Sequence, residues 1–379
     1  MTAVQEPSAL VGEQSLAELC RLAAEHREHG ERHGTLHPKL WHAVEESVLP
    51  RVAVPAQCAG LEWPVPRILD AVHQVAAADP AAGWVTAIHA PAGAFLSRLD
   101  PAIALGLAGP RPVIAGSSLP VGSTERHPAG VRLTGRWPLV TGAPAMTLAA
   151  LAAPVHGTDG TAATRWWLVP RRHLTIEEDW DALGLRGSAS FTVGCDTDVP
   201  FEHGICLTEA PRLDAPLFRY PLYGLMAGCI AVVAQATAER SLTAFNQLAA
   251  RTHTRHEAGT LAQQPTAQAA FARAQGRLRA ATALLNSATT AAWNSALAGH
   301  VPDAERALLR SACCHMAEAA EHVCRELFDA AGTAAVHRHS ALEGCWRDAV
   351  TISRHALVAQ RGRQLVGAYG LNAAAAKDL

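Results

Sequence analysis

Two histidines stand in segments where an imidazole could do proton chemistry. His89 follows Trp84, Val85 and Ile88 in an otherwise apolar helical segment. An imidazole changes its charge near neutral pH, so it can give or take a proton where few other side chains can. On burial habits alone, a lone histidine on such a face is more often a core residue. Catalysis or substrate binding and core packing are therefore both open for His89.

His355 is the stronger of the two candidates. It lies near the end of the chain, in a segment with the pattern of a helix. Asp348, Thr351 or Ile352, and His355 recur at spacings of about three to four residues, so we expect them to share one face of that helix. This spacing places a carboxylate and an imidazole on the same surface.

Several motifs that would indicate other chemistry are absent. No G-x-G-x-x-G follows a strand-like segment and no G-x-x-x-x-G-K-[ST] occurs, so we expect neither a Rossmann nicotinamide site nor a P-loop. No G-x-S-x-G elbow indicates a serine hydrolase. No C-x-x-C or H-E-x-x-H pattern occurs, so no metal site is expected. The nine cysteines, scattered singly except for Cys313 and Cys314, are typical of small core residues in a reducing compartment.

Composition narrows the choice of partner. The 379 residues are 49% hydrophobic and 17% charged, enough to bury a large core, and the formal net charge is −2. No basic field is present that could hold a nucleic-acid backbone or an anionic membrane surface, so a small molecule is the expected partner. No long apolar stretch stands at the N-terminus, and we expect a cytoplasmic protein without a membrane association.

Three stretches of the chain differ in pattern and must position these residues. Residues 1–110 have apolar side chains at helical spacing, residues 111–210 contain short runs of Val, Leu, Thr and Trp broken by turns, and residues 211–379 are Ala-rich and helical again. The sequence therefore predicts a mainly α protein with a central small β domain. Its parts are an N-terminal helical domain (1–110), an antiparallel β domain (111–210) and a C-terminal four-helix bundle (211–379).

Helix boundaries in the last stretch are chemically marked. Pro265 stands in the first turn of one predicted helix. Asp303 is placed to cap the next helix, and Gly332 to end it. Ser340 and Glu343 have the spacing of a capping box, which predicts a last helix that stays periodic to about residue 370.

This order of helical lobe, small β domain and four-helix bundle resembles the acyl-CoA dehydrogenase superfamily. Four segments are similar, in order and spacing, to its branch of two-component (group D) flavin-dependent monooxygenases, which includes dibenzothiophene monooxygenase, phenol hydroxylases and amino-sugar nitrososynthases. Together they cover the chain from about residue 20 to residue 370. The segments are AADPAAGWVTAIHA, GRWPLVTGA, DWDALGLRGSASFTV and LFDAAGTAAVHRHSALEGCWRDAVTISRHA.

The resemblance implies a flavin between the β domain and the helical bundle. Thr141 with Gly142, and Ser188 with Ser190, match positions where polar groups meet the pyrimidine edge of the ring. Small hydroxyls and glycines allow donors to approach a flat heterocycle closely, although without the resemblance these are ordinary turn residues. The residues expected to contact the flavin are Trp137, Thr141, Gly142, Arg186, Ser188, Ser190 and Gly332.

The resemblance also implies roles for the two histidines. Members of the branch place an active-site histidine at the position of His89, and His355 is expected to hydrogen-bond the flavin peroxide or to take a substrate proton. Val350 departs from the pattern, because several relatives carry a second histidine there. Arg347 and Asp348 match an Arg-Asp pair common in the superfamily, which we expect to serve structure or packing between subunits.

The missing carboxylate separates two reactions of this fold. A dehydrogenase needs a glutamate to take the α-proton next to a thioester, and its place falls at Ala356 or, in a minority of cases, near Leu222. Neither position offers an acid. The resemblance therefore implies an oxygen-dependent monooxygenase that hydroxylates carbon or nitrogen of a small molecule, using reduced FAD or FMN, O2 and a separate NAD(P)H:flavin reductase.

Two alternatives stay open at this point. One is a flavin dehydrogenase or oxidase of the same fold. The other is a non-redox or scaffold relative, for which Thr333, in place of the second glycine of a Gly-Gly pair, and Val350 leave room. Long Ala-rich helices with apolar faces on more than one side further predict a homodimer or homotetramer.

Overall fold

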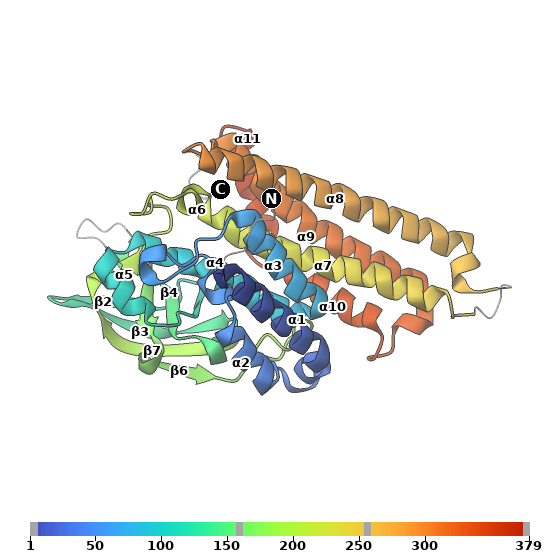
Figure 1. Cartoon of the computed structure of the whole chain (residues 1–379), viewed down its shortest axis with the longest axis horizontal. Coiled ribbons are helices and arrows are strands. Elements are labelled where there is room, and N and C mark those ends of the chain that lie inside the picture. Colours follow the sequence, from blue (N-terminus) through green and yellow to red (C-terminus); the bar gives the residue numbers. More distant parts are fainter. Residues whose placement is uncertain (1–6, 157–161, 254–258, 374–379) are drawn as a thin grey trace.

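The structure, a computed structural model, describes residues 7–156, 162–253 and 259–373. Helices come first, two small sheets follow and a long helical bundle ends the chain (Figure 1). This confirms the predicted mainly α architecture with a central β part. The division into domains at residues 110 and 210 stays a prediction, and the helices of both ends share one hydrophobic core.

The first part of the chain is helical, and prolines open several of its helices. Pro80 is the first residue of α4, where its ring presets the helical φ. Asp79 caps this helix, because its carboxylate accepts hydrogen bonds from the N–H groups of Ala81 and Ala82, both at 3.3 Å. The elements, with 3-10 helices written as η, are α1 (Pro7–His33), α2 (Pro38–Glu46), η1 (Leu49–Arg51), η2 (Ala56–Cys58), α3 (Val65–Ala78), α4 (Pro80–Ala92), η3 (Gly93–Arg98) and α5 (Pro101–Ala108).

Two four-stranded sheets form a sandwich, with strand orders β1-β4-β5-β8 and β2-β3-β7-β6. β1 and β4 pair in parallel, so the prediction of a wholly antiparallel β domain was wrong in this pairing. The chain between β1 and β4 forms β2 and β3 of the other sheet, and this crossover allows β4 to run in the same direction as β1. The elements are β1 (Ile114–Ser117), β2 (Ser123–His127), β3 (Gly130–Val140), η4 (Ala143–Ala145), β4 (Leu148–His156), β5 (Ala162–Pro170), η5 (Arg171–His173), β6 (Leu174–Glu177), β7 (Phe191–Val199), η6 (Phe201–His203) and β8 (Gly204–Ile205).

β4 directs its side chains alternately into two cores. Leu148 and Ala150 pack with the helices, whereas Ala149 and Leu151 pack between the two sheets. A strand that is buried on both faces fastens its sheet to the helices. This attachment holds the β sandwich against α4, the helix that carries His89.

The last part of the chain is a bundle of long helices. Pro265 opens α8 and Gly332 follows the end of α9, as predicted. Asp303 is the first residue of α9, and Pro302 takes the cap position, so the predicted aspartate cap was wrong. The elements are α6 (Pro216–Arg219), α7 (Leu222–Ala249), η7 (Leu261–Gln263), α8 (Pro265–Leu297), α9 (Asp303–Ala331), η8 (Gly332–Ala335), α10 (Ala341–Ser353) and α11 (Gln360–Gly370).

The start and the end of α10 differ from the prediction. Ser340 is the cap residue, but its hydroxyl has no hydrogen-bond partner in the described part of the chain. The carboxylate of Glu343 pairs instead with Arg347, one turn further on, so no capping box forms. The helix ends at Ser353, and residues 354–359 form a turn before α11 begins.

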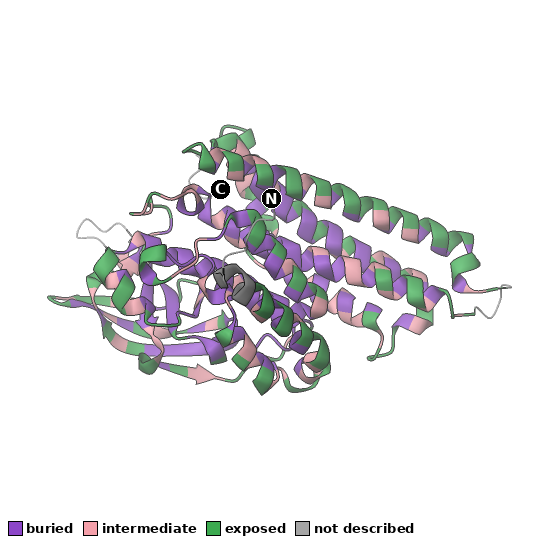
Figure 2. Cartoon of the chain, viewed as in Figure 1, coloured by how far each residue is buried: buried purple, intermediate pink, exposed green. Residues whose placement is uncertain are grey.

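Burial follows this arrangement. The bundle helices are buried on their inner sides, while the outer side of α8 is exposed (Figure 2). α7 is long and apolar enough to cross a membrane by composition, but 78% of its most apolar window is buried inside the protein. The apolar character of α7 is therefore that of a core helix.

Candidate active site

His89 lies on α4 against the end of β3. Its side chain is buried, and neither ring nitrogen has a hydrogen-bond partner among the described residues. Burial removes water from the imidazole and lowers its pKa to about 4, an effect that the nearby backbone of Thr141 partly opposes. His89 is therefore uncharged at neutral pH and keeps hydrogen-bonding capacity that the protein leaves unused.

Gly142 gives this imidazole its space. The residue has a φ of +69°, and a Cβ atom added there would stand 2.4 Å from His89 Nε2. The left-handed conformation and the close approach both require a residue without a side chain. The glycine of the GRWPLVTGA segment thus keeps open the place where the ring of His89 meets the β sandwich.

A chain of buried polar groups runs from α4 into the sandwich. The indole N–H of Trp84 donates to Thr141 Oγ1 at 3.2 Å, and this hydroxyl is 2.9 Å from Ser190 Oγ. Ser190 is in turn 2.9 Å from Ser188 Oγ. Thr141, Ser188 and Ser190 are all buried, so direct hydrogen bonds join segments far apart in the sequence here.

His355 approaches the same indole from the bundle. Its ring lies edge-on to Trp84, with the ring centroids 5.4 Å apart and the planes at 76°. The backbone N–H of Leu357 donates to His355 Nδ1 at 3.3 Å, which leaves Nε2 as the second hydrogen-bonding atom. Burial, and to a smaller extent the charge of Arg310, lowers the pKa of His355 to about 4.

The expected helical face of Asp348, Thr351 and His355 does not exist. Because α10 ends at Ser353, His355 lies in the turn that follows. The hydroxyl of Thr351 donates to the backbone carbonyl of Arg347, and the carboxylate of Asp348 points to another segment altogether. His355 therefore reaches the site through the turn after α10.

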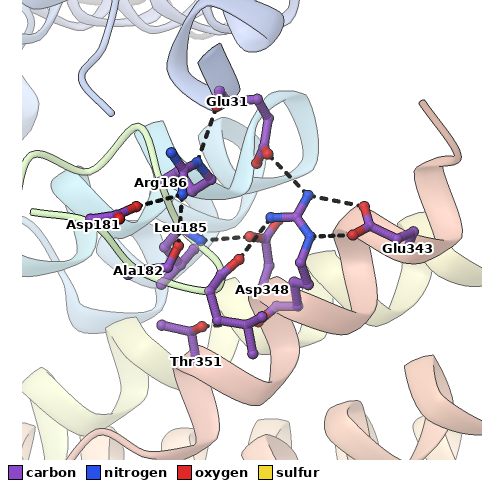
Figure 3. Close-up of polar contacts among 10 residues, drawn as sticks. Glu31, Asp181, Ala182, Leu185, Arg186, Glu343, Asp348 and Thr351 are labelled. Carbon is purple, nitrogen blue, oxygen red and sulfur yellow. Dashed lines mark hydrogen bonds and ion pairs between the residues drawn. The ribbon is translucent and has the colours of Figure 1, made fainter. Parts of the chain in front are cut away.

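The loop of residues 178–190, which carries both serines, is held by α10. The carboxylate of Asp348 accepts a hydrogen bond from the N–H of Leu185 at 2.6 Å (Figure 3). Leu185 has a φ of 52° and Ala189 a φ of 44°, conformations that cost a residue with a side chain about 1–2 kcal/mol each. The contact with Asp348 holds the loop in this strained conformation.

Arg347 binds the same loop from its other side. Its guanidinium donates to the carbonyl of Leu183 at 2.8 Å and pairs with Glu31 of α1 and Glu343 of α10. An added Cβ on Gly184 would stand 2.3 Å from the carbonyl oxygen of Arg347, so α10 and the loop are in direct contact. The Arg-Asp pair thus ties three parts of one chain together, which supports the structural role expected for it.

Three residues expected at the flavin lie elsewhere in the structure. Trp137 is fully buried between the two sheets, where its indole N–H donates to the carbonyl of Ala152 at 2.7 Å. Arg186 pairs with Asp181 and donates to the carbonyls of Glu31 and Ala182 (Figure 3). Gly332 is exposed, and an added Cβ would meet nothing within 4 Å. Their contact with a flavin stays a prediction, and the protomer does not bring them to the two histidines.

The residues that do come together fit a flavin. Unpartnered ring nitrogens of His89, a glycine cradle beside them and small hydroxyls on Thr141, Ser188 and Ser190 suit the polar edge of a flat heterocycle. The described residues contain no group of three or more His, Cys, Asp or Glu that could hold a metal ion.

The sequence reasoning missed two residues of this region. Trp84 connects the hydroxyl chain to His355, and only its contacts across the fold reveal that. Arg310 is buried on α9, and its charge acts on His355. A charged residue within the apolar stripe of a helix is a signal that could have drawn attention to Arg310.

Comparison with known proteins gives two kinds of match. Residues 228–360 match the family described as acyl-CoA dehydrogenase, C-terminal domain. The chain is 29% identical over 322 residues to an indole-3-acetate monooxygenase of Pseudomonas putida, covering 84% of this chain and 82% of that protein. It is 26% identical over 312 residues to the oxygenase component of an FADH2-dependent resorcinol hydroxylase of a Rhizobium species, covering 76% of each.

Solved structures agree with these matches. The XiaF protein of a Streptomyces species, solved in complex with FADH2 and glycerol, superposes with a TM-score of 0.87 at 25% sequence identity and covers 96% of each chain. That protein was solved with a reduced flavin bound, the cofactor that the residues of the present site fit.

Proposed function

We propose that this chain, which is similar over most of its length to flavin-dependent monooxygenases of the acyl-CoA dehydrogenase superfamily, hydroxylates a small aromatic molecule as the oxygenase component of a two-component system. The observation that carries the proposal is that a buried hydroxyl chain at Trp84 has two uncharged imidazoles beside it, the half-buried His355 edge-on to Trp84 and the buried His89 against Gly142. The related monooxygenases of indole-3-acetate and resorcinol support an aromatic substrate.

A bound reduced flavin supplies the two electrons with which O2 is split into one oxygen atom for the product and one for water. The residues of this chain hold protons and exclude water. Because Nδ1 accepts the N–H of Leu357, Nε2 carries the proton of the neutral His355 ring, and it is the atom proposed to donate a hydrogen bond to the activated oxygen. His89 offers a second imidazole without a hydrogen-bond partner among the described residues, and the buried hydroxyls of Thr141 and Ser190 are the groups that would contact the polar edge of the flavin.

Dehydrogenation of an acyl thioester is disfavoured by the side chains present. Ala356 directly follows His355, and the first turn of α7 holds Leu222 and Tyr223, so neither place has a carboxylate to take an α-proton. Binding of reduced flavin distinguishes an enzyme from a scaffold protein, because only the enzyme needs to bind it. Assays with FAD and with FMN identify the flavin that is used. Assays with different substrates show whether carbon or nitrogen is oxygenated.

A two-component system needs a source of reduced flavin. We expect a separate NAD(P)H:flavin reductase, since the sequence has no Rossmann glycine motif of its own. A cytoplasmic location and a homodimeric or homotetrameric assembly complete the proposal.

The test is a single-turnover assay with chemically reduced flavin, O2 and aromatic substrates such as indole-3-acetate and resorcinol. We expect one atom of ¹⁸O from ¹⁸O2 in the product by mass spectrometry, and no product with NADH in place of reduced flavin. Oxidation of NADH by the isolated protein would contradict the two-component scheme. Failure to bind reduced flavin at all would support the scaffold alternative.

A further inference from the structure

Arg310 is a buried cation that the mechanism leaves unused. It lies on α9, 2% exposed, within a stripe that includes the buried residues Ala307, Cys313 and Ala317. Its Nε has no hydrogen-bond partner in the described part of the chain, a terminal nitrogen donates to the carbonyl of Tyr223 at 3.4 Å, and the uncharged thiol of Cys314 lies beside the guanidinium. Among the described residues, no carboxylate forms an ion pair with it.

The surroundings of Arg310 place it beside the candidate active site. A Cβ added to Gly362 would stand 3.2 Å from Arg310 Nε and 3.1 Å from the carbonyl oxygen of Leu357, two residues beyond His355. On the α7 side, the guanidinium carbon lies 6.0 Å from the centre of the Tyr223 ring. Arg310 therefore lies between the start of α7 and the segment that begins with His355.

A second guanidinium belongs to the same neighbourhood. Arg98 is half-buried, its Nε lacks a partner among the described residues, and it donates to the carbonyl of Leu207 at 3.3 Å. Burial lowers the pKa of both Arg98 and Arg310, and Tyr223 partly opposes this for both. The region thus holds two guanidinium groups, and no carboxylate of the described residues forms an ion pair with either of them.

A buried charge without a counter-ion destabilises a folded protein unless a ligand compensates it. We propose that Arg310 binds an anionic group of the substrate, which makes the substrate an aromatic carboxylate whose ring lies toward His355. The inference rests on the proposed function for the identity of the ring. The planar guanidinium is suited to this task, because it presents paired N–H donors that match a carboxylate.

The experiment measures ligand binding and needs no turnover. Isothermal titration calorimetry is carried out on the flavin-loaded protein with indole-3-acetate and with its uncharged amide, indole-3-acetamide. The wild type should bind the acid at least about tenfold more tightly. Arg310→Gln should lower the affinity for the acid by about 10- to 100-fold, the scale of one charge-assisted hydrogen bond, and leave the affinity for the amide unchanged. Arg310→Lys should keep part of the preference for the acid.

Arg325→Gln is the matched control, because Arg325 lies fifteen residues further along α9 and its side chain is 57% exposed. It should change neither affinity. Arg310→Met, which removes the unpaired charge, should unfold at the same or a higher temperature than the wild type, whereas a structural arginine would lose stability.

Three outcomes would overturn the assignment. Equal affinity of the wild type for the acid and the amide would contradict an anion site. So would an equal loss of affinity for both ligands in Arg310→Gln. If Arg310→Gln lost affinity for reduced FMN but not for reduced riboflavin, Arg310 would be assigned to the flavin phosphate. Acid-selective binding without oxygenation would instead refute the proposed function and leave this site in place, so the two failures are distinguishable.

Discussion

At the scale of single residues, the imidazoles of His89 and His355 differ in their burial and in the hydrogen bonds of their ring nitrogens. Burial lowers the pKa of His89 and His355 to about 4, so both are uncharged near pH 7 and act as hydrogen-bonding groups. His89 is fully enclosed beside Gly142, whereas His355 is half-buried in a turn and has one ring nitrogen engaged. Only His355 combines a remaining free nitrogen with partial access, which makes it the leading candidate for proton transfer.

His355→Ala should retain the fold and the affinity for reduced flavin while lowering product formation by about 10²- to 10⁴-fold, the scale of a general acid-base residue. Consumption of O2 should continue and appear as hydrogen peroxide, because the reaction is no longer coupled to the substrate. Product by chromatography and peroxide by a coupled peroxidase assay measure the two branches.

His89→Ala is the companion variant. If His355→Ala keeps normal coupling of O2 to product and the companion loses it, His89 takes over the role. A lower unfolding temperature of His355→Ala with unchanged coupling would make His355 a packing residue.

At the scale of elements, α10 acts as a clamp on the loop of residues 178–190. The loop includes Leu185 and Ala189 in left-handed conformations, and such strain persists only where neighbouring structure holds it. The N–H of Leu185 is held by Asp348, and the carbonyl of Leu183 is held by Arg347. The hydroxyls of Ser188 and Ser190 are placed at the end of this chain of contacts.

Asp348→Ala should lower the free energy of unfolding by about 1–3 kcal/mol, since it leaves the buried N–H of Leu185 without an acceptor. The affinity for reduced flavin should fall with it as the loop relaxes. Asp348→Asn keeps an acceptor oxygen and should restore both. Denaturant titration and flavin fluorescence measure these effects, and equal losses in the two variants would contradict a role as hydrogen-bond acceptor.

The same carboxyl predicts a pH dependence. Burial, opposed in part by the Leu185 N–H, raises the pKa of Asp348 to about 7 from an ordinary value of 3.8. The folded state therefore holds a proton that the unfolded state has released, and this contribution to stability is lost as pH rises from about 4 to about 7. Asp348→Asn should accordingly gain stability relative to the wild type as the pH rises from about 4 to about 7.

At the scale of the whole molecule, one hydrophobic core runs through both helical parts and the outer face of the first sheet. A second core lies between the sheets. α8 borders this body with an exposed face of small residues, spaced as one helical stripe. The stripe consists of Ala269, Ala272, Gly276, Ala280 and Ala283.

A stripe of small residues allows a second helix to approach closely, and we expect a second copy of this chain to pack there. Light scattering at micromolar concentration should give a dimer or tetramer. Ala280→Arg should shift the mass toward the protomer, whereas the control Ala24→Arg on the exposed side of α1 should not. A monomeric wild type would contradict the prediction.

The sequence by itself determined the order of the elements and the class of chemistry. Helical periodicity, Pro265 at the start of α8 and Gly332 after α9 are local signals that depend on neighbouring residues only, and they were confirmed. The segments around Thr141, Ser188 and His355 were sufficient to indicate a flavin monooxygenase, because their types and order are visible without a fold.

Only the tertiary structure decided which side chains meet. A bulge in β3 between Trp137 and Val140 directs both into the sandwich and leaves Thr141 to reach Trp84. One extra residue reverses the faces of a strand, and no local pattern announces it. The contact of Asp348 with Leu185 joins two segments that are far apart in the sequence. The lack of an ion pair at Arg310 likewise follows only from which segments pack around it.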